Sequence, residues 1–181
     1  MLERSQCILR PVKREDLEKL LEWRNADRIR AYMYTDHLIG WEEHAAWFER
    51  LGTNDTARAL LFEVNDRPLG VVNVTRIDRL NGTCHWGFYI GEADAPKGSG
   101  TALGYLGLEY IFGTLGIRKV TGEAFAFNEA SIAFHRRLGF SQEGHFVRHV
   151  MKNGSYQDIL SFALFRDQWE AHKQQFNPFA P

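Results

Sequence analysis

Cysteine is scarce in this chain of 181 residues, which contains only Cys7 and Cys84. The two lie far apart in the sequence, each in an apolar, strand-like stretch, and they lack the spacing of metal ligands. Their scarcity argues against a disulfide framework and against a cysteine metal centre. We expect two buried thiols in a protein of the reducing cytoplasm, with no metal site.

Long apolar runs and an excess of one charge are also missing. No segment approaches the ~20 apolar residues that span a bilayer, and residues 1–5 lack the apolar run of a signal peptide. The 22 basic and 23 acidic residues give a net charge of −1, and the basic residues are scattered. This distribution argues against nucleic acid or a membrane surface as the partner. A small molecule fits better.

The length suits one domain with a full hydrophobic core. No internal repeat, low-complexity tract or linker divides the chain. We therefore expect a single domain over residues 1–181, ordered to about residue 175, with residues 177–181 frayed.

The first half predicts a strand, two helices and three further strands. We expect a strand at residues 7–10, a helix at 17–24 and a second helix at 42–51, with an aromatic and polar connection at 32–37 between the helices. Three strand-like runs follow at 59–64, 70–77 and 83–91, separated by turn residues at 65–68 and 81–82. These runs predict an antiparallel meander.

A glycine loop follows the third of these strands. It precedes a predicted helix at residues 101–115 and reads Lys97-Gly98-Ser99-Gly100-Thr101-Ala102. Glycines let the backbone approach a ligand, and the helix that follows turns free N–H groups and its dipole to the same point. The spacing matches neither G-x-G-x-x-G nor a P-loop. An anionic cofactor is expected, and an ordinary strand-to-helix turn is the alternative.

The second half predicts a parallel strand, a helix and a hairpin. Residues 120–125 form a strand that a helical crossover makes parallel to the strand at 83–91. Asn128 caps a helix that ends at Gly139. Strands at 144–152 and 156–164 flank Asn153-Gly154, and a last helix is expected at 167–175. The whole predicts an α/β (α+β) fold, a mixed sheet of about seven strands flanked by helices.

Two motifs resemble those of the GNAT family of N-acetyltransferases. The loop resembles the pyrophosphate motif Gln/Arg-x-x-Gly-x-Gly/Ala, with Lys97 in the first position. Asn128, Ser131 and His135, followed by Gly139-Phe140, resemble the family's second motif on the helix after strand five. The resemblance implies acetyl-CoA as the cofactor, strands four and five splayed around its pantetheine arm, and Asn128 and Ser131 in contact with that arm. A plain helix cap is the alternative role for Asn128.

The resemblance also implies catalytic roles. A bulge at Phe88, Tyr89 and Ile90 would free a backbone N–H for the thioester carbonyl, and a glycine-adapted twist without function is the alternative. Glu123 is the candidate base for the acceptor amine, or a surface or salt-bridged carboxylate. His135 stands where family members usually have the tyrosine that protonates the departing thiolate. It is either that acid or a packing residue.

The acceptor side resembles, more loosely, the bacterial nucleotide-sugar branch of the family, which acetylates the 4-amino group of a UDP-linked dideoxy amino sugar in pseudaminic acid synthesis. This resemblance rests on residues 23–25, 33–37 and 43–48. Arg24, His44 and Arg76 would then hold the diphosphate, and Asn73, Thr75 and Tyr89 would contact the sugar or uracil ring.

Other readings of the acceptor side stay open. The enzyme could instead acetylate a ribosomal-protein N-terminus or a polyamine, or the chain could bind CoA without catalysis. A polyamine site would favour clustered carboxylates, which these segments lack. An exposed final strand could pair between subunits, so a homodimer is a further expectation.

Overall fold

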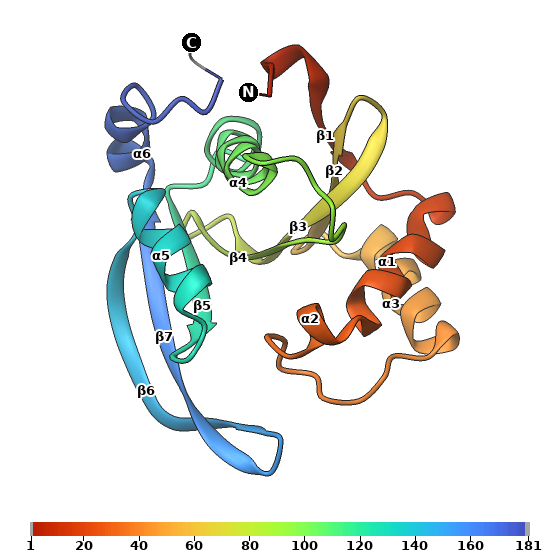
Figure 1. The fold of residues 1–181 in the computed structure, drawn as a ribbon. Coiled ribbons are helices and arrows are strands. Elements are labelled where there is room, and N and C mark those ends of the chain that lie inside the picture. The colour runs from red at the N-terminus through yellow and green to blue at the C-terminus, as the bar shows by residue number, and fades with distance from the viewer. Residues whose placement is uncertain (1, 180–181) are drawn as a thin grey trace.

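The computed structural model describes residues 2–179, which build a seven-stranded mixed sheet in the order β1-β2-β3-β4-β5-β7-β6 (Figure 1). All neighbouring strands are antiparallel except β4 and β5, which are parallel. The strands are β1 (Cys7–Pro11), β2 (Arg58–Val64), β3 (Arg67–Asp78), β4 (Thr83–Ile90), β5 (Lys119–Phe125), β6 (Ser141–Lys152) and β7 (Ser155–Phe165). The predicted mixed sheet is confirmed.

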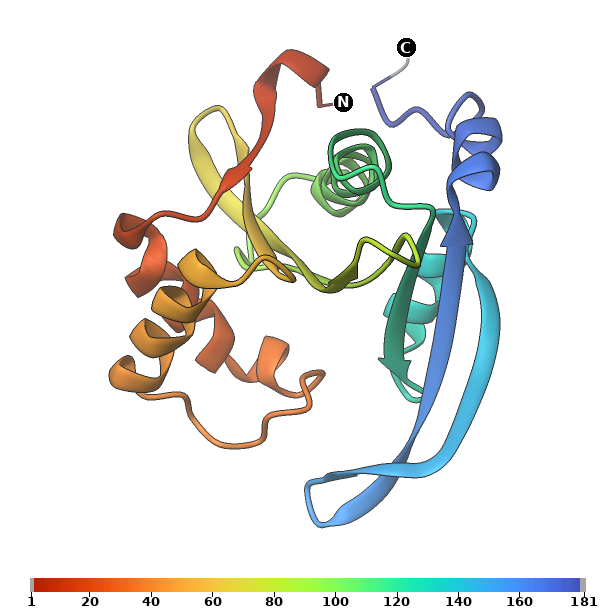
Figure 2. The same ribbon diagram turned by 180° about the vertical axis from the view of Figure 1, so that it is seen from behind.

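The helices divide between the two faces of the sheet. They are α1 (Leu17–Asn25), α2 (Asp27–Arg30), α3 (Trp41–Thr53), α4 (Ser99–Glu109), α5 (Glu129–Arg137) and α6 (Arg166–His172), with a π-helical turn at Tyr110–Thr114. Figures 1 and 2 show α1, α2 and α3 gathered beside the β1–β3 half, away from α4 and α5. No helix among residues 2–179 is long and apolar enough to cross a membrane.

Each face has its own apolar core. Val72 and Trp86 of the sheet pack under α4, which comes so close that a Cβ on Gly107 would lie 3.2 Å from Val72. On the other face Val71 packs with Leu17 and Leu20 of α1. Because adjacent residues of a strand point to opposite faces, the consecutive valines of β3 serve both cores. A strand buried on both faces explains the continuous apolar run at this point of the sequence.

The parallel pair of strands separates after a short contact. β4 and β5 are in register only from Thr83 opposite Lys119 to Trp86 opposite Gly122. Beyond that point β4 pairs only with β3, and β5 pairs only with β7. The predicted splay of strands four and five is therefore confirmed, and it opens a gap at their carboxyl ends.

The structure corrects several expected boundaries. The connection after the first helix contains the short helix α2, and α4 begins at Ser99, two residues earlier than expected. The exposed edge strand is β6, because the hairpin folds its last strand, β7, between β5 and β6. In residues 177–179, for which fraying was expected, the Phe179 ring lies 5.8 Å from that of Tyr105. Residues 180–181 lie outside the described part of the chain.

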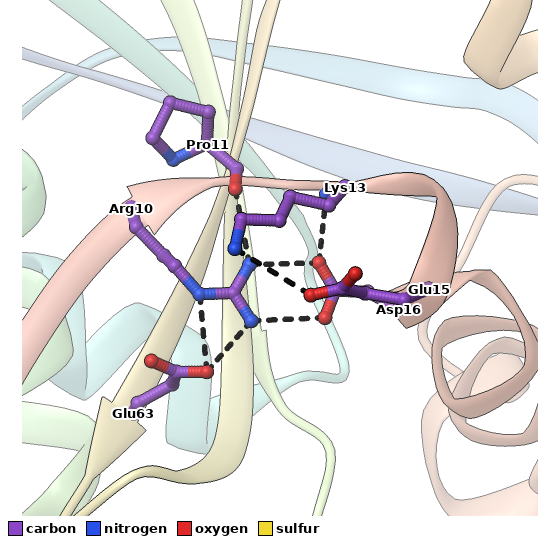
Figure 3. Close-up of polar contacts among 6 residues, drawn as sticks. All are labelled: Arg10, Pro11, Lys13, Glu15, Asp16 and Glu63. Atoms are coloured by element: carbon purple, nitrogen blue, oxygen red, sulfur yellow. Dashed lines mark hydrogen bonds and ion pairs between the residues drawn. The ribbon is translucent and has the colours of Figure 1, made fainter.

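Arg10 of β1 ties the start of α1 to the sheet (Figure 3). Its guanidinium donates to both carboxylate oxygens of Asp16, at 2.8 and 2.9 Å, and to Glu63 Oε1 of β2 at 2.7 Å. The Lys13 N–H donates to the same Asp16 carboxylate at 2.7 Å. Asp16 directly precedes α1 and is buried. Burial alone would raise the pKa of Asp16, but the hydrogen bonds from Arg10 and Lys13 hold it below its ordinary value.

We expect Asp16→Asn to lower the free energy of unfolding by about 1–3 kcal/mol at pH 7, because it weakens a charge-assisted bidentate contact. Since folding lowers the pKa of Asp16, its contribution is fully present above the ordinary pKa of about 3.8 and is lost as the pH falls through the folded-state pKa. The deficit of the variant should therefore shrink in acid. Urea unfolding across pH 3–7 measures it.

Glu15→Gln is the matched control, because Glu15 makes only an exposed contact with Lys13 beside the same network. It should change the free energy of unfolding by less than about 0.5 kcal/mol. Equal losses in the two variants would show that Asp16 acts as an ordinary surface charge.

Candidate active site

The gap between β4 and β5 is part of a cleft of about 790 Å³. The cleft continues from α4 and α5, across the ends of the two strands, to α1 and α3. Its lining includes most of the side chains singled out from the sequence: Arg24, His44, Asn73, Thr75, Phe88, Tyr89, Ile90, Gly100, Glu123, Asn128, Ser131 and His135. One cavity therefore joins residues that lie up to 111 positions apart in the chain.

Backbone N–H groups of β4 face this gap. Residues of a strand hydrogen-bond alternately to its two neighbours, and the Gly91 N–H bonds to Leu69 O on the β3 side. The alternation turns the N–H groups of Phe88 and Ile90 toward the gap. The Ile90 carbonyl faces the same way, because Arg28 Nη1 donates to it at 3.2 Å. The expected bulge is wrong: β3 and β4 stay in register through 88–90, and the strand divergence alone frees these groups.

The glycine loop closes the first turn of α4. Gly98 is the N-cap with φ +97°, a conformation that favours glycine, and nothing lies within 4 Å of where its Cβ would be. The Ser99 N–H and hydroxyl both donate to Pro96 O, so Ser99 shapes the loop from inside. The N–H groups of Gly100 and Thr101 donate to no group among residues 2–179. Two free donors at a helix N-terminus suit a phosphate.

Other loop residues line a separate hollow of about 290 Å³ beside the chain ends. Its lining comprises Leu2, Lys97, Gly98, Thr101, Ala102, Asn177 and Pro178. Arg137 of α5 adds a cation here, donating to Thr101 Oγ1 at 3.1 Å. Sequence reasoning missed Arg137, because only the packing of α5 against the loop brings the two together.

Asn128 and Ser131 sit where α5 meets the cleft. The Asn128 side-chain oxygen accepts the Ser131 N–H at 3.1 Å, so Asn128 is an N-cap as predicted. The cap occupies only the oxygen, and the Asn128 amide NH₂ donates to no group of residues 2–179. Both residues line the cleft, so the cap is compatible with a ligand contact.

His135 is buried, and both its ring nitrogens have partners. Nδ1 donates to Ser131 O at 2.9 Å, and Nε2 accepts the Trp86 indole N–H at 3.3 Å. The ring also stacks on Phe162, 5.0 Å between centroids. Burial lowers the pKa of His135 to about 4. A second proton on Nε2 would point at the Trp86 N–H, so the geometry holds a neutral ring.

Glu123 projects into the cleft with one oxygen held and one free. Tyr34, in the loop after α2, donates its hydroxyl to Glu123 Oε2 at 2.6 Å, and no group of residues 2–179 binds Oε1. The Tyr34 ring packs edge-on against Phe125. Partial burial and the Glu123 carboxylate raise the pKa of Tyr34. Tyr34 was missed from the sequence, since nothing local pairs a loop tyrosine with a strand 89 residues away.

The far end of the cleft presents three polar side chains without internal partners. Arg24 of α1, Asn73 of β3 and Tyr89 of β4 all line it, and none makes a side-chain hydrogen bond within residues 2–179. Burial lowers the pKa of Arg24 and raises that of Tyr89. Thr75 lines the cleft beside them, whereas Arg76 is exposed and lines neither hollow.

His44 differs from the cation expected of it. It is buried, donates Nε2–H to Leu17 O at 3.0 Å and stacks on Trp47. Burial, reinforced by the nearby Arg24, lowers its pKa. A neutral His44 offers Nδ1 as an acceptor and adds no positive charge for a diphosphate.

These donors fit coenzyme A. Gly100 of α4, Asn128 and the β4 residues Phe88 and Ile90 line one cleft, and Thr101 lines the second hollow. The family model for the acetyltransferase (GNAT) domain matches residues 6–141.

Known proteins of this kind are similar along most of the chain. The uncharacterized N-acetyltransferase YokL of a Bacillus subtilis prophage is 29% identical over 126 residues, 68% of this chain and 70% of its own length. The spermidine N(1)-acetyltransferase of Escherichia coli is 25% identical over 166 residues, 91% and 89% of the two chains. The crystal structure of the Vibrio cholerae spermidine N-acetyltransferase with CoA and spermine superposes with a TM-score of 0.87 at 21% identity, covering 92% and 99%. The chain belongs to the GNAT family and is an acetyltransferase that uses acetyl-CoA.

Proposed function

We propose that this enzyme acetylates a primary amine of a small molecule by direct transfer in a ternary complex, and that the acceptor is a polyamine. The observation that carries the transfer is the Glu123 carboxylate, which has a free oxygen at the gap where the Phe88 and Ile90 N–H groups point. Acetyl-CoA supplies the acetyl group as a thioester. The relatives named spermidine acetyltransferases support the polyamine, as do the two carboxylates in the cleft, Glu43 and Glu123.

The residues divide the work by their positions. Glu123 accepts the proton that the ammonium of the acceptor must lose, while Tyr34 orients the carboxylate through Oε2. The Phe88 and Ile90 N–H groups stabilise negative charge that develops on a carbonyl oxygen in the gap. The free N–H groups of Gly100 and Thr101, with Arg137, bind phosphate. We assign His135 to packing rather than to proton donation, because its Nε2 already accepts the Trp86 N–H.

A second acceptor is favoured by the arginines of this chain. Arg24, Arg28, Arg50 and Arg58 outnumber the carboxylates of the cleft. Arg24 in particular is partly desolvated, has no hydrogen-bond partner within residues 2–179 and lines the cleft with Tyr89 and Asn73. A guanidinium in that state suits a phosphate or carboxylate. The candidate is an amine that also carries an anion, such as the UDP-linked amino sugar; the comparisons do not support that branch.

The first prediction concerns Glu123. Glu123→Gln should lower kcat by roughly 100-fold or more, because the acceptor loses its base. Acetyl-CoA affinity, measured by calorimetry, should stay within about twofold of the wild type. Glu18→Gln, an exposed carboxylate of α1, is the control and should be silent. Near-normal turnover of the Glu123 variant would remove this residue from the mechanism.

The second prediction concerns His135. Folding lowers its pKa from 6.5 to about 4, so the unfolded chain binds the proton more tightly. The contribution of His135 to the free energy of unfolding is fully present above pH 6.5. It is lost as the pH falls toward 4, which lowers the free energy of unfolding by roughly 3 kcal/mol. His135→Gln should flatten that part of the curve of unfolding free energy against pH.

The His135→Gln variant also separates packing from acid catalysis. At pH 8 we expect its turnover to remain within about tenfold of the wild type, provided circular dichroism shows a folded protein. The control, His37→Gln, alters an exposed imidazole and should change the free energy of unfolding at pH 8 by less than about 0.5 kcal/mol. If folded His135→Gln instead turned over roughly 100-fold more slowly than the wild type, the acid role would be restored.

The third prediction distinguishes the two acceptors by whether Arg24→Gln lowers or raises the KM of the amine. Thiol release from acetyl-CoA is measured with spermidine, a UDP-linked amino sugar and a basic N-terminal peptide. If a polycation is the acceptor, Arg24→Gln should lower its KM, because a like charge is removed. If the acceptor carries an anion, the same change should raise KM by about tenfold or more.

Arg79→Gln is the charge-matched control, since Arg79 is exposed and outside the cleft. Release with the peptide alone would overturn both small-molecule acceptors. Binding of acetyl-CoA without release in any arm would favour a non-catalytic CoA-binding module.

A further inference from the structure

The Lys152 ammonium is buried inside a loop that belongs to the other end of the chain. Its side chain is only 3% exposed. Nζ lies 2.9 Å from Arg30 O, 2.7 Å from Met33 O, 3.4 Å from Thr35 O and 2.5 Å from Asp36 Oδ1. A buried ammonium is tolerated only when its N–H groups are satisfied. The three N–H groups donate to the three carbonyls, and the Asp36 carboxylate pairs with the charge, so Lys152 holds one short segment in a single arrangement.

The contact joins the tip of the β6–β7 hairpin to the loop after α2. Lys152 ends β6 at the tip of the β6–β7 hairpin, which Figures 1 and 2 show as a long arm reaching toward the side of α2 and the loop after it. The Asn153 N–H adds a bond to Asp36 Oδ2 at 3.2 Å. Asp36 thus makes an ion pair with Lys152 and accepts a hydrogen bond from Asn153, which fixes the hairpin tip against the loop.

The loop that Lys152 holds is a wall of the acceptor site. Residues 31–40 contain no helix or strand. Tyr32, Met33 and Thr35 line the cleft, and Tyr34 between them bonds Glu123. Backbone hydrogen bonds hold the first residues of the loop, as far as Met33, and side-chain contacts hold the rest. Arg30 Nη1 donates to Asp36 O at 2.8 Å. Asn25 holds Ile39 through both backbone groups, at 2.8 and 2.9 Å, and Lys152 holds the end that carries Tyr34.

We propose that Lys152 is a positioning residue for the acceptor amine: by gathering the carbonyls of residues 30, 33 and 35 and the Asp36 carboxylate, it places Tyr34 on Glu123 and forms the acceptor wall. The effect of Lys152 on the KM of the amine rests on the proposed function. Its role in placing the loop rests on the geometry alone. The side-chain polar contacts of Lys152 all go to residues 30–36, and none goes to the glycine loop or to α5.

Lys152→Met tests the proposal, since methionine keeps the apolar length and removes the ammonium. The amine KM should rise about tenfold or more, measured with whichever of spermidine and the UDP-amino sugar the wild type acetylates. The acetyl-CoA KM should stay within about twofold. Hydrogen exchange at amides 31–37 should accelerate at least about tenfold, with exchange at 99–107 unchanged. A general structural defect would change both KM values and both segments.

Lys119→Met is the matched control. Lys119 also makes an ion pair with the hairpin, through Glu143 at 2.7 Å, but near the base of the arm and far from the loop. Its amine KM should be unchanged. If Lys152→Met does not fold, Asp36→Asn replaces it, and the same split between the two KM values is expected at about threefold or more.

The outcomes separate this proposal from the proposed function. If the wild type acetylates none of the three amines, the proposed function fails, and exchange at 31–37 alone decides whether Lys152 organises the loop. Unchanged exchange at 31–37 in Lys152→Met, or an unchanged amine KM in a folded variant of an active enzyme, overturns the positioning role.

Discussion

The Trp86 indole N–H donates to His135 Nε2 at 3.3 Å directly over Gly122, the last residue of β5 that pairs with β4. A Cβ on Gly122 would lie 2.6 Å from that nitrogen and 2.7 Å from the indole, so no other residue fits without displacing them. One side chain from β4 and one from α5 thus occupy the fork of the two strands. Beyond it the strands diverge, and the Phe88 and Ile90 N–H groups lose the partner that a continuous parallel ladder would supply. A donor left unpaired in a cleft costs free energy until an oxygen binds it, so the fork that packs these two side chains also leaves two N–H groups available to a ligand.

The electrostatics of the cleft follow from what is buried in it. His44 and His135 are both desolvated and both donate to helix carbonyls, so each is held as a neutral ring. The charges that remain are the Glu43 and Glu123 carboxylates and the arginines around Arg24. A substrate therefore meets separate positive and negative groups rather than a field of one sign. That division leaves the acceptor class to be set by which charge the substrate places near Arg24.

Segments far away in the sequence close the cleft where β4 and β5 diverge. The loop after α2 brings Tyr34 to Glu123, and the hairpin tip holds that loop through Lys152. Asn177 and Pro178 line the separate hollow beside the glycine loop. The central strands and α4 contribute the free backbone N–H groups. Irregular segments from both ends of the chain form the walls around them. Such segments are the part of a site most open to change, because loops tolerate substitution better than the sheet beneath them.

Local patterns in the sequence determined the parts whose cause is local. Period-two runs and turn residues identified the strands, the glycines of residues 97–102 predicted the loop before α4, and Asn128 identified the start of α5. Those signals were enough for the fold and the cofactor, because backbone N–H groups at a helix start need only the right loop. Only the tertiary structure decided what the side chains of the site do. His135 reads as an acid or a packing residue in sequence, and its burial among Trp86, Phe140 and Phe162 is the observation on which the proposed packing role rests. Tyr34, Arg137 and Lys152 carry no local signal, since their partners lie 36 to 122 residues away and only packing brings them together.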